Sequence, residues 1–95
     1  MKTGIELIAE ERKEQIEKHG RSIEMDVKIN TDFQLGTAAC CLCYEAIEEI
    51  DCRNEPPTEW NLELWQKMHD KPYKQRLIIA GAMLAAEIDR LQAID

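Results

Sequence analysis

The segment KPYKQRLIIAGAMLAAEIDRLQAID, residues 71–95, decides the fold class, because it carries the longest helical pattern in the chain. Pro72 suits the start of a helix, since the N–H that proline lacks would have no partner in the first turn. No proline follows Pro72 in the sequence. The segment therefore predicts a helix that runs on to Asp95 and is about 36 Å long.

One side of this expected helix is apolar and is predicted to face the core. Its residues recur at steps of three and four, which places them on one face of a helix. They are Leu77, Gly81, Leu84, Ile88 and Leu91. Gly81 costs a helix interior about 1 kcal/mol relative to alanine, so we expect it where a second helix comes close.

A second stripe flanks the apolar face and contains two charged residues. Its members follow one another at steps of four, three and four: Arg76, Ala80, Met83 and Glu87. Two interpretations of the charged pair are open. Either Arg76 and Glu87 reach a pocket at the edge of the core, or they extend to water while their stems cover apolar surface.

Composition and charge restrict the class of protein. The length of 95 residues corresponds to a single domain, residues 1–95, with one modest core. Aromatic residues make up only 5% of the chain, which argues against a sheet sandwich. The formal net charge of −7 argues against nucleic-acid binding, because a negative chain repels the phosphate backbone. No apolar run is long enough for a membrane span and no signal peptide is recognised, so we expect a cytoplasmic protein without membrane contact.

The first part of the chain predicts one long helix followed by a loop. Apolar residues at helical spacing run from Thr3 to about His19, and Gly20 supplies a C-terminal stop. The next ten residues, Arg21–Asn30, have no steady period. We expect them to form a loop that brings Asp26 near the first helix.

The middle of the chain predicts a second long helix and a short one. Thr31 and Gln34 have the spacing of a capping box, which predicts a helix from there to about Ile50. A short helix is expected over Thr58–Met68, whose two tryptophans either cover the core or stack on a ligand. The predicted fold class is therefore all-α, a four-helix bundle-like domain with three long helices and one short helix.

Four cysteines allow two interpretations. They are Cys40, Cys41, Cys43 and Cys52. In a reducing compartment they would be small residues packed in or beside a helix. Alternatively Cys40 and Cys43, which share a helix face, could bind a metal together with a histidine or Cys52.

An acidic motif lies on the first expected helix. Glu10, Glu11 and Glu14 form the pattern EExxE, in which the first and last carboxylates lie one above the other on a helix. Together with Glu87 from a facing helix, such groups can hold Mg²⁺ through direct bonds and bound waters. A solvated acidic helix face would show the same pattern, so both interpretations stay open.

The chain also resembles a family of small phage- and prophage-type helical proteins. The resemblance covers ELIAEERKEQIEKHG (residues 6–20), then Asp26, a helix that begins near Leu35, a tryptophan segment, and KP…R…AGA…AAEIDRL toward the C-terminus. It extends, more loosely, to the MazG-like all-alpha nucleotide pyrophosphohydrolases, which pair an EExxE helix with an ExxD helix. The segment EEID at residues 48–51 matches ExxD farther downstream than usual, and the segment that begins at Glu87 has Arg90 where the aspartate is expected.

This resemblance implies an enzyme that cleaves a nucleoside triphosphate to the monophosphate and pyrophosphate with Mg²⁺. The metal ligands it implies are Glu10, Glu11, Glu14, Asp26 and Glu87. The catalytic residues would be Glu11, Arg12 and Arg76, which would activate water or stabilise the developing charge. The substrate would be bound by Gln15, Lys71 and Trp65.

Two other functions compete with this enzyme. One is a non-catalytic helical module for protein interaction or oligomerisation, in which the acidic faces are only solvated. The other is a metal or redox sensor that uses Cys40, Cys41 and Cys43. For any of them we expect a homodimer or higher homo-oligomer, because a chain of this length has too small a core to cover every apolar helix face. The small-residue face at 36–41 and Gly81 would serve as the contact.

Overall fold

The computed structural model describes residues 1–44 and 52–94, which contain five α-helices and one short 3₁₀ helix. In chain order the elements are α1 (Gly4–His19), α2 (Ile23–Ile29), α3 (Gln34–Cys43), η1 (Cys52–Asn54), α4 (Leu62–His69) and α5 (Tyr73–Ile94). These two stretches contain no strand, so the prediction of an all-α fold is confirmed for them. None of their helices combines the length and the apolar character needed to cross a lipid bilayer.

Helix α1 begins and ends with clear capping signals. The Thr3 hydroxyl accepts a hydrogen bond from the Glu6 backbone N–H, and the Glu6 carboxylate accepts one from the Thr3 N–H. This reciprocal pair satisfies two donors that the first turn leaves open. At the other end Gly20 adopts a left-handed conformation with φ 64°, which glycine tolerates best. The predicted stop at Gly20 is confirmed.

The region predicted as a loop contains a helix. Ser22 caps α2 by accepting from the Met25 N–H at 3.2 Å, and the helix then covers only seven residues before Asn30. A helix of two turns is too short to show a recurring apolar face, which is why the sequence pattern did not reveal it. The expectation of four helices is corrected accordingly, since the described residues hold five.

Helix α3 starts differently from the prediction. Phe33 is its N-cap in a left-handed conformation (φ 62°) with no side-chain cap bond, so the capping box from Thr31 to Gln34 is wrong. The Gln34 side chain instead accepts from the Asp32 N–H at 2.7 Å and donates to the Ile29 carbonyl at 3.2 Å. Gln34 therefore ties the end of α2 to the start of α3. The helix ends at Cys43 and Tyr44 is extended, so the predicted uninterrupted helix to about Ile50 is wrong at Tyr44. The rest of that stretch, residues 45–50, lies outside the described residues.

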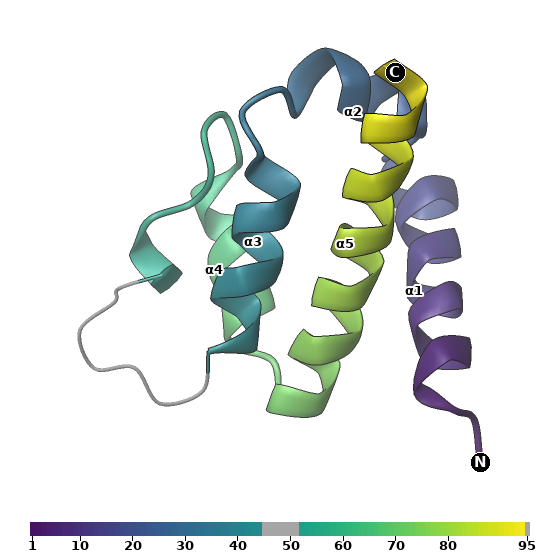
Figure 1. Ribbon diagram of the computed structural model, residues 1–95. Coiled ribbons are helices and arrows are strands. Elements are labelled where there is room, and N and C mark those ends of the chain that lie inside the picture. Colours follow the sequence, from purple (N-terminus) through teal and green to yellow (C-terminus); the bar gives the residue numbers. More distant parts are fainter. Residues whose placement is uncertain (45–51, 95) are drawn as a thin grey trace.

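Helix α5 is the centre of the fold. It lies between α3 and α1, with α2 near its C-terminal end and α4 on the far side of α3 (Figure 1). The core forms where α3, α4 and α5 meet, and Trp65 from α4 is its largest fully buried side chain. The other buried members are Leu35, Ala38, Ala39, Leu42, Ile79, Ala80, Met83 and Ala86. Trp60 packs against this cluster, so the interpretation of both tryptophans as cover for the core is supported.

The buried face of α5 is not the predicted one. Leu77, Leu84, Ile88 and Leu91, expected in the core, are 38%, 48%, 57% and 41% exposed. The buried residues belong instead to the flanking stripe and its neighbours. They are Arg76, Ile79, Ala80, Ala82, Met83, Ala86, Glu87 and Arg90. The small side chains on this second face let α3 come close, and close packing decides which face is covered.

Gly81 lies at a close approach of α1 to α5. A Cβ atom built on Gly81 would lie 2.5 Å from Cδ1 and 2.8 Å from Cγ1 of Ile8. The expectation that Gly81 lets another helix come close is therefore met by α1 of the same chain. Gly81 is not available as a contact between two copies.

Candidate functional site

Several polar and charged residues are buried within the helical bundle. They are Gln15, Asp26, Asn30, Gln34, Arg76, Glu87 and Arg90. Burying such groups is unfavourable unless they have hydrogen-bond or charge partners. The partners of each residue therefore show whether it has a structural role or is open to a ligand.

Asp26 on α2 is one of three described residues with a buried side-chain atom that lacks a hydrogen-bond partner, beside Arg12 and His69. Its side chain is 2% exposed, and its Oδ1 accepts from Asn30 Nδ2 at 2.7 Å. Its Oδ2 is buried and has no hydrogen-bond partner. Burial raises the pKa of Asp26 and outweighs the opposing effects of the Asn30 hydrogen bond and of Arg12 and Arg21. Asp26 is thus a buried carboxyl with a raised pKa whose second oxygen has no hydrogen-bond partner.

Arg21 follows directly after the cap of α1 and lies over an aromatic ring. Its guanidinium carbon is 5.6 Å from the centroid of the Trp60 indole, a distance at which cation and ring attract each other. The indole Nε1 in turn donates to Asn30 Oδ1 at 2.9 Å. Burial lowers the pKa of Arg21, while Asp26 and Glu11 raise it. Trp60, Asn30 and Asp26 therefore form a chain of contacts beneath Arg21.

Arg12 holds the turn that carries Arg21. Its Nη1 donates to the Arg21 carbonyl at 3.2 Å, and its Nη2 lies 3.4 Å from Asp89 Oδ2 on α5. Its Nε is buried without a hydrogen-bond partner. Arg12, predicted as catalytic, thus holds the Arg21 backbone in place through this hydrogen bond.

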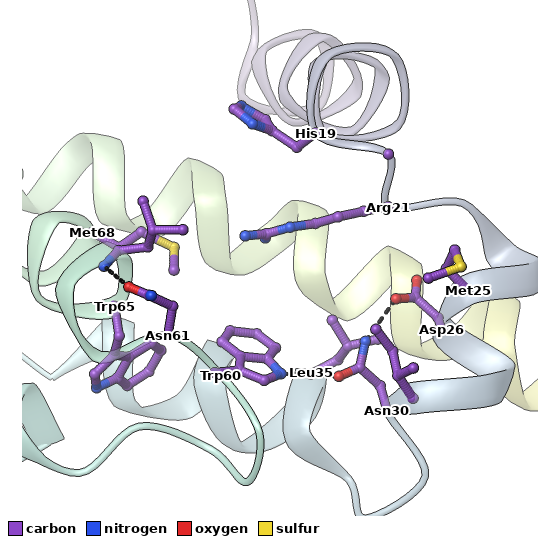
Figure 2. A pocket seen from close by; sticks show the side chains of 13 residues that line it. His19, Arg21, Met25, Asp26, Asn30, Leu35, Trp60, Asn61, Trp65 and Met68 are labelled. Carbon is purple, nitrogen blue, oxygen red and sulfur yellow. Dashed lines mark hydrogen bonds between the residues drawn. The ribbon is translucent and has the colours of Figure 1, made fainter.

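A groove runs from this point along α1 and α4. Its inner part is a pocket of about 250 Å³ lined by Asp26, Asn30 and Trp60, among others. A second pocket of about 280 Å³ shares four lining residues with the first: His19, Arg21, Leu64 and Met68. We call the two together the α1–α4 groove. Figure 2 shows the Arg21 side chain reaching across its inner part, with Trp60 and Met68 on the other side.

The outer end of the groove has mixed charge. Glu11, Glu14, Gln15, Lys67 and Lys71 line the second pocket. A third hollow of about 330 Å³ continues past it and is bordered by Glu10, Glu11, Glu14 and Lys71. The EExxE glutamates therefore face one continuous concave surface together with a lysine.

The five predicted metal ligands do not form one cluster. Glu10 pairs with Lys2, and Glu14 lies 3.8 Å from Lys18. Glu87 accepts from Arg90 Nε at 2.6 Å, inside the bundle. The structure thus separates three glutamates at the outer end of the groove, Asp26 at its inner end and Glu87 outside it.

Within residues 1–44 and 52–94, no group of three or more histidine, cysteine or acidic side chains is arranged to hold a metal ion. The five residues therefore do not fit Mg²⁺ as a ready ligand set. Glu11 and Glu14, which line the same pocket, do fit a looser arrangement. Mg²⁺ commonly uses one or two carboxylates and completes its coordination with waters and substrate phosphates.

The remaining predicted residues have different positions. Gln15 is buried and, like Lys71, lines the groove. Trp65 lines the inner pocket but is fully buried, and its indole donates to the Cys52 carbonyl at 2.6 Å. Arg76 donates to the carbonyls of Tyr44 at 2.7 Å and Lys71 at 3.0 Å, so it fastens the end of α3 to the start of α5.

Arg21 was missed as a site residue, and Trp60 was considered only as one of two tryptophans that cover the core or stack on a ligand. Both lie in connecting segments, where helical periodicity gives no information. Their positions next to helix ends were the available signal. Arg21 directly follows Gly20, which ends α1, and Trp60 directly precedes Asn61, which caps α4.

In the part of the chain that the structure describes, the cysteines form no group of three or more ligands that could hold a metal ion. Cys40 and Cys43 are exposed, Cys41 is half-buried and Cys52 is buried, and all four are free thiols. Burial and the neighbouring Cys52 raise the pKa of Cys41 to about 12. A thiol that stays protonated at neutral pH is a poor nucleophile and a poor metal ligand, which weakens the sensor interpretation.

No protein-family model matches this chain, and neither the curated proteins nor the solved structures contain a match. Its function must therefore be inferred from the groove and from the surface of the helices.

Proposed function

We propose that the α1–α4 groove binds a nucleoside triphosphate and that the chain is a Mg²⁺-dependent pyrophosphohydrolase of the MazG-like kind. The observation that carries the proposal is the distribution of groups along the groove. Trp60 and the Asp26 carboxyl, whose Oδ2 has no hydrogen-bond partner, lie at the inner end. Two glutamates and two lysines lie at the outer end.

The inner end suits a nucleobase. Trp60 offers an indole edge and Arg21 a planar cation, and the two already lie against each other. Asp26 Oδ2 has no protein partner and can hydrogen-bond to a base or a sugar hydroxyl. Ligand sites of this kind are largely apolar with few polar groups that fix orientation, as this pocket is.

The outer end suits the phosphates. Lys67 and Lys71 line the second pocket and can donate to phosphate oxygens, and Arg21 lies between the two ends of the groove. Mg²⁺, when bound with the nucleotide, would supply positive charge against the triphosphate. Glu11 lines both outer pockets, so it is the residue placed to accept a proton from an attacking water.

Binding and hydrolysis can be tested separately. Calorimetry with a panel of nucleoside triphosphates and Mg²⁺ is expected to show binding that Lys71→Gln weakens by about tenfold. Lys74→Gln is the matched control, because Lys74 is exposed in the first turn of α5, three residues after Lys71, and does not line the groove.

Hydrolysis is followed as pyrophosphate release. Glu11→Gln is expected to abolish turnover but keep nucleotide binding, while Glu17→Gln on the exposed side of α1 leaves both intact. A chain that binds none of the nucleotides, with or without Mg²⁺, would contradict the proposal.

A second candidate function is a non-catalytic module for helix interaction. The observation that favours it is the exposed apolar side of α5, with Leu84 48% and Ile88 57% exposed. Such a module would show self-association or partner binding with no effect of nucleotides on its melting temperature. The nucleotide panel therefore distinguishes the two functions.

A further inference from the structure

The Arg21 guanidinium is partly removed from water and has no hydrogen-bond acceptor in the described part of the chain. Arg21 is half-buried, and burial lowers its pKa. Among residues 1–44 and 52–94, no backbone or side-chain oxygen accepts a hydrogen bond from its guanidinium, which lies over the Trp60 ring at 5.6 Å. Removing a charge from water is unfavourable unless it gains a partner. The donors of Arg21 are therefore available to an anion that enters the groove.

The backbone of Arg21 is held at both of its polar groups. Its N–H donates to the Gln15 carbonyl at 3.0 Å, and its carbonyl accepts from Arg12 Nη1 at 3.2 Å. Arg12 is in turn held on α5, because its Nη2 lies 3.4 Å from Asp89 Oδ2. The side chain is therefore the part of Arg21 that can change position, by rotation about its own bonds.

The Arg21 side chain has favourable charge on both sides. Asp26 lines the inner pocket and Glu11 the outer one, and both raise the pKa of Arg21 because they attract its positive charge. Arg21 itself lines both pockets, and Figure 2 shows its side chain extended across the inner one. Lys67 and Lys71 line the outer pocket as well. A phosphate bound beside these lysines would add negative charge on the outer side of Arg21.

We propose that Arg21 is the residue that selects phosphorylated ligands in the α1–α4 groove. In the free protein its guanidinium covers the Trp60 ring, and when a triphosphate binds it leaves the ring for the phosphate oxygens. This inference rests on the proposed function, since it describes how the same groove chooses its substrate. A guanidinium forms two parallel, charge-assisted hydrogen bonds to a phosphate, whereas its attraction to a ring is non-specific in direction and weaker at exposed sites.

The exchange links the two ends of the groove through one side chain. Once Arg21 has moved to the phosphates, the face of Trp60 that it covered is open for a nucleobase to stack on. An unphosphorylated nucleoside has to displace Arg21 from the ring without offering its guanidinium a new partner. The groove therefore binds a nucleoside weakly, although the inner pocket has room for polar and apolar contacts with it.

The position of Arg21 can be followed without any nucleotide. In the free chain the ring current of Trp60 should shift the NMR signal of the Arg21 δ-methylene protons upfield, because the guanidinium lies over the ring. Inorganic triphosphate with Mg²⁺ is expected to return this signal toward its ordinary position. A signal that is unshifted in the free chain, or that inorganic triphosphate does not move, would overturn the proposal.

Calorimetry with Arg21→Met measures the selectivity. Methionine keeps an apolar stem and removes the charge, so a nucleoside triphosphate should bind about tenfold more weakly. The matching nucleoside should bind more tightly than to the unmodified chain, because the ring is no longer covered by a cation. Arg21→Lys keeps the charge and should recover part of the triphosphate affinity. Lys28→Met on α2 is the matched control, because Lys28 is exposed and lines neither pocket.

The outcomes separate this inference from the proposed function. Thermal unfolding first establishes that each variant is folded. If the unmodified chain binds nucleoside triphosphates but Arg21→Met changes both affinities in the same direction, or changes neither, the role of Arg21 is wrong and the proposed function is unaffected. If Arg21 responds to inorganic triphosphate but no nucleoside triphosphate binds, the proposed function is contradicted, while the exchange of Trp60 for phosphate is supported.

Discussion

The two sides of α5 differ from those of a usual surface helix, which buries apolar residues and exposes charged ones. Toward α3 and α2 the helix buries Arg76, Glu87 and Arg90, while its outer side exposes leucines and an isoleucine. Buried charges on the inner side require exact partners, because each charge left alone in the interior is strongly unfavourable. The outer side has no such requirement within one chain. The inner side therefore controls the stability of the single chain, and substitutions on the outer side should affect that stability much less.

The largest effect is expected from breaking the ion pair on the inner side. Arg90 is 4% exposed and donates to Glu87 at 2.6 Å, with Asp26 also nearby. Arg90→Met leaves Glu87 without its cation and should lower the free energy of unfolding by about 3–5 kcal/mol in denaturant titrations. The double variant Glu87→Gln, Arg90→Met removes both charges and should recover part of the loss. Equal stability of the single and double variants would show that the pair is not what holds this side together.

A smaller effect is expected where α1 meets α5. Gly81→Ala puts a methyl group 2.5 Å from Ile8 Cδ1, so the side chain of Ile8 must move. We expect a loss of about 1–2 kcal/mol despite the better helix propensity of alanine. Gly36→Ala is the control, because its nearest atom beyond the local helix is 3.9 Å away, and it should be neutral or stabilising. Ile8→Val, which removes Cδ1, should relieve part of the loss in the Gly81→Ala background.

The next prediction concerns pH and the carboxyl that α2 directs toward the groove. Burial raises the pKa of Asp26 above its usual 3.8, so the folded state favours the protonated form. The stability of the chain should then fall as pH rises from 3.8 through the folded-state pKa. Asp26→Asn mimics the neutral form and should stabilise the chain at neutral pH. Thermal unfolding from pH 3 to 8 should show this gain growing with pH, and a gain that does not depend on pH would contradict the explanation.

The smallest effect is expected on the outer side. Leu84→Gln, measured by denaturant titration at a concentration low enough to keep the chain monomeric, should change the free energy of unfolding by no more than about 0.5 kcal/mol. A loss of several kcal/mol in the monomer would mean that Leu84 belongs to the core of the single chain. The contrast with Arg90 would then disappear.

Helical periodicity predicted the long elements but could not predict which face is covered. In α5 the leucines and the small residues repeat at the same spacing, so both stripes satisfied the pattern. The choice was made by packing, since Ala80 and Ala86 allow a closer approach of α3 than the leucines do. That choice depends on contacts between distant segments, which a single sequence does not contain.

The candidate site was only partly predictable for a related reason. Glu11, Gln15 and Lys71 were found from their positions on or beside helices, and the structure places them along one groove. Arg21 and Trp60 come from connecting segments, and the left-handed Phe33 is a conformation that no local signal indicated. Glu87 was taken as a ligand because of its spacing, but the structure pairs it with Arg90 inside the bundle.

The position of α5 in the chain has a consequence for synthesis. Helices α1, α2 and α3 each pack mainly against α5, which is the last of the described helices to be made. While the ribosome is still adding residues 73–94, α1, α2 and α3 lack the helix that they mainly pack against. Most of the native packing therefore forms only after α5 leaves the ribosome, although domains usually gain structure from the N-terminus onward. Until then part of the apolar surface of α1, α2 and α3 stays exposed to water.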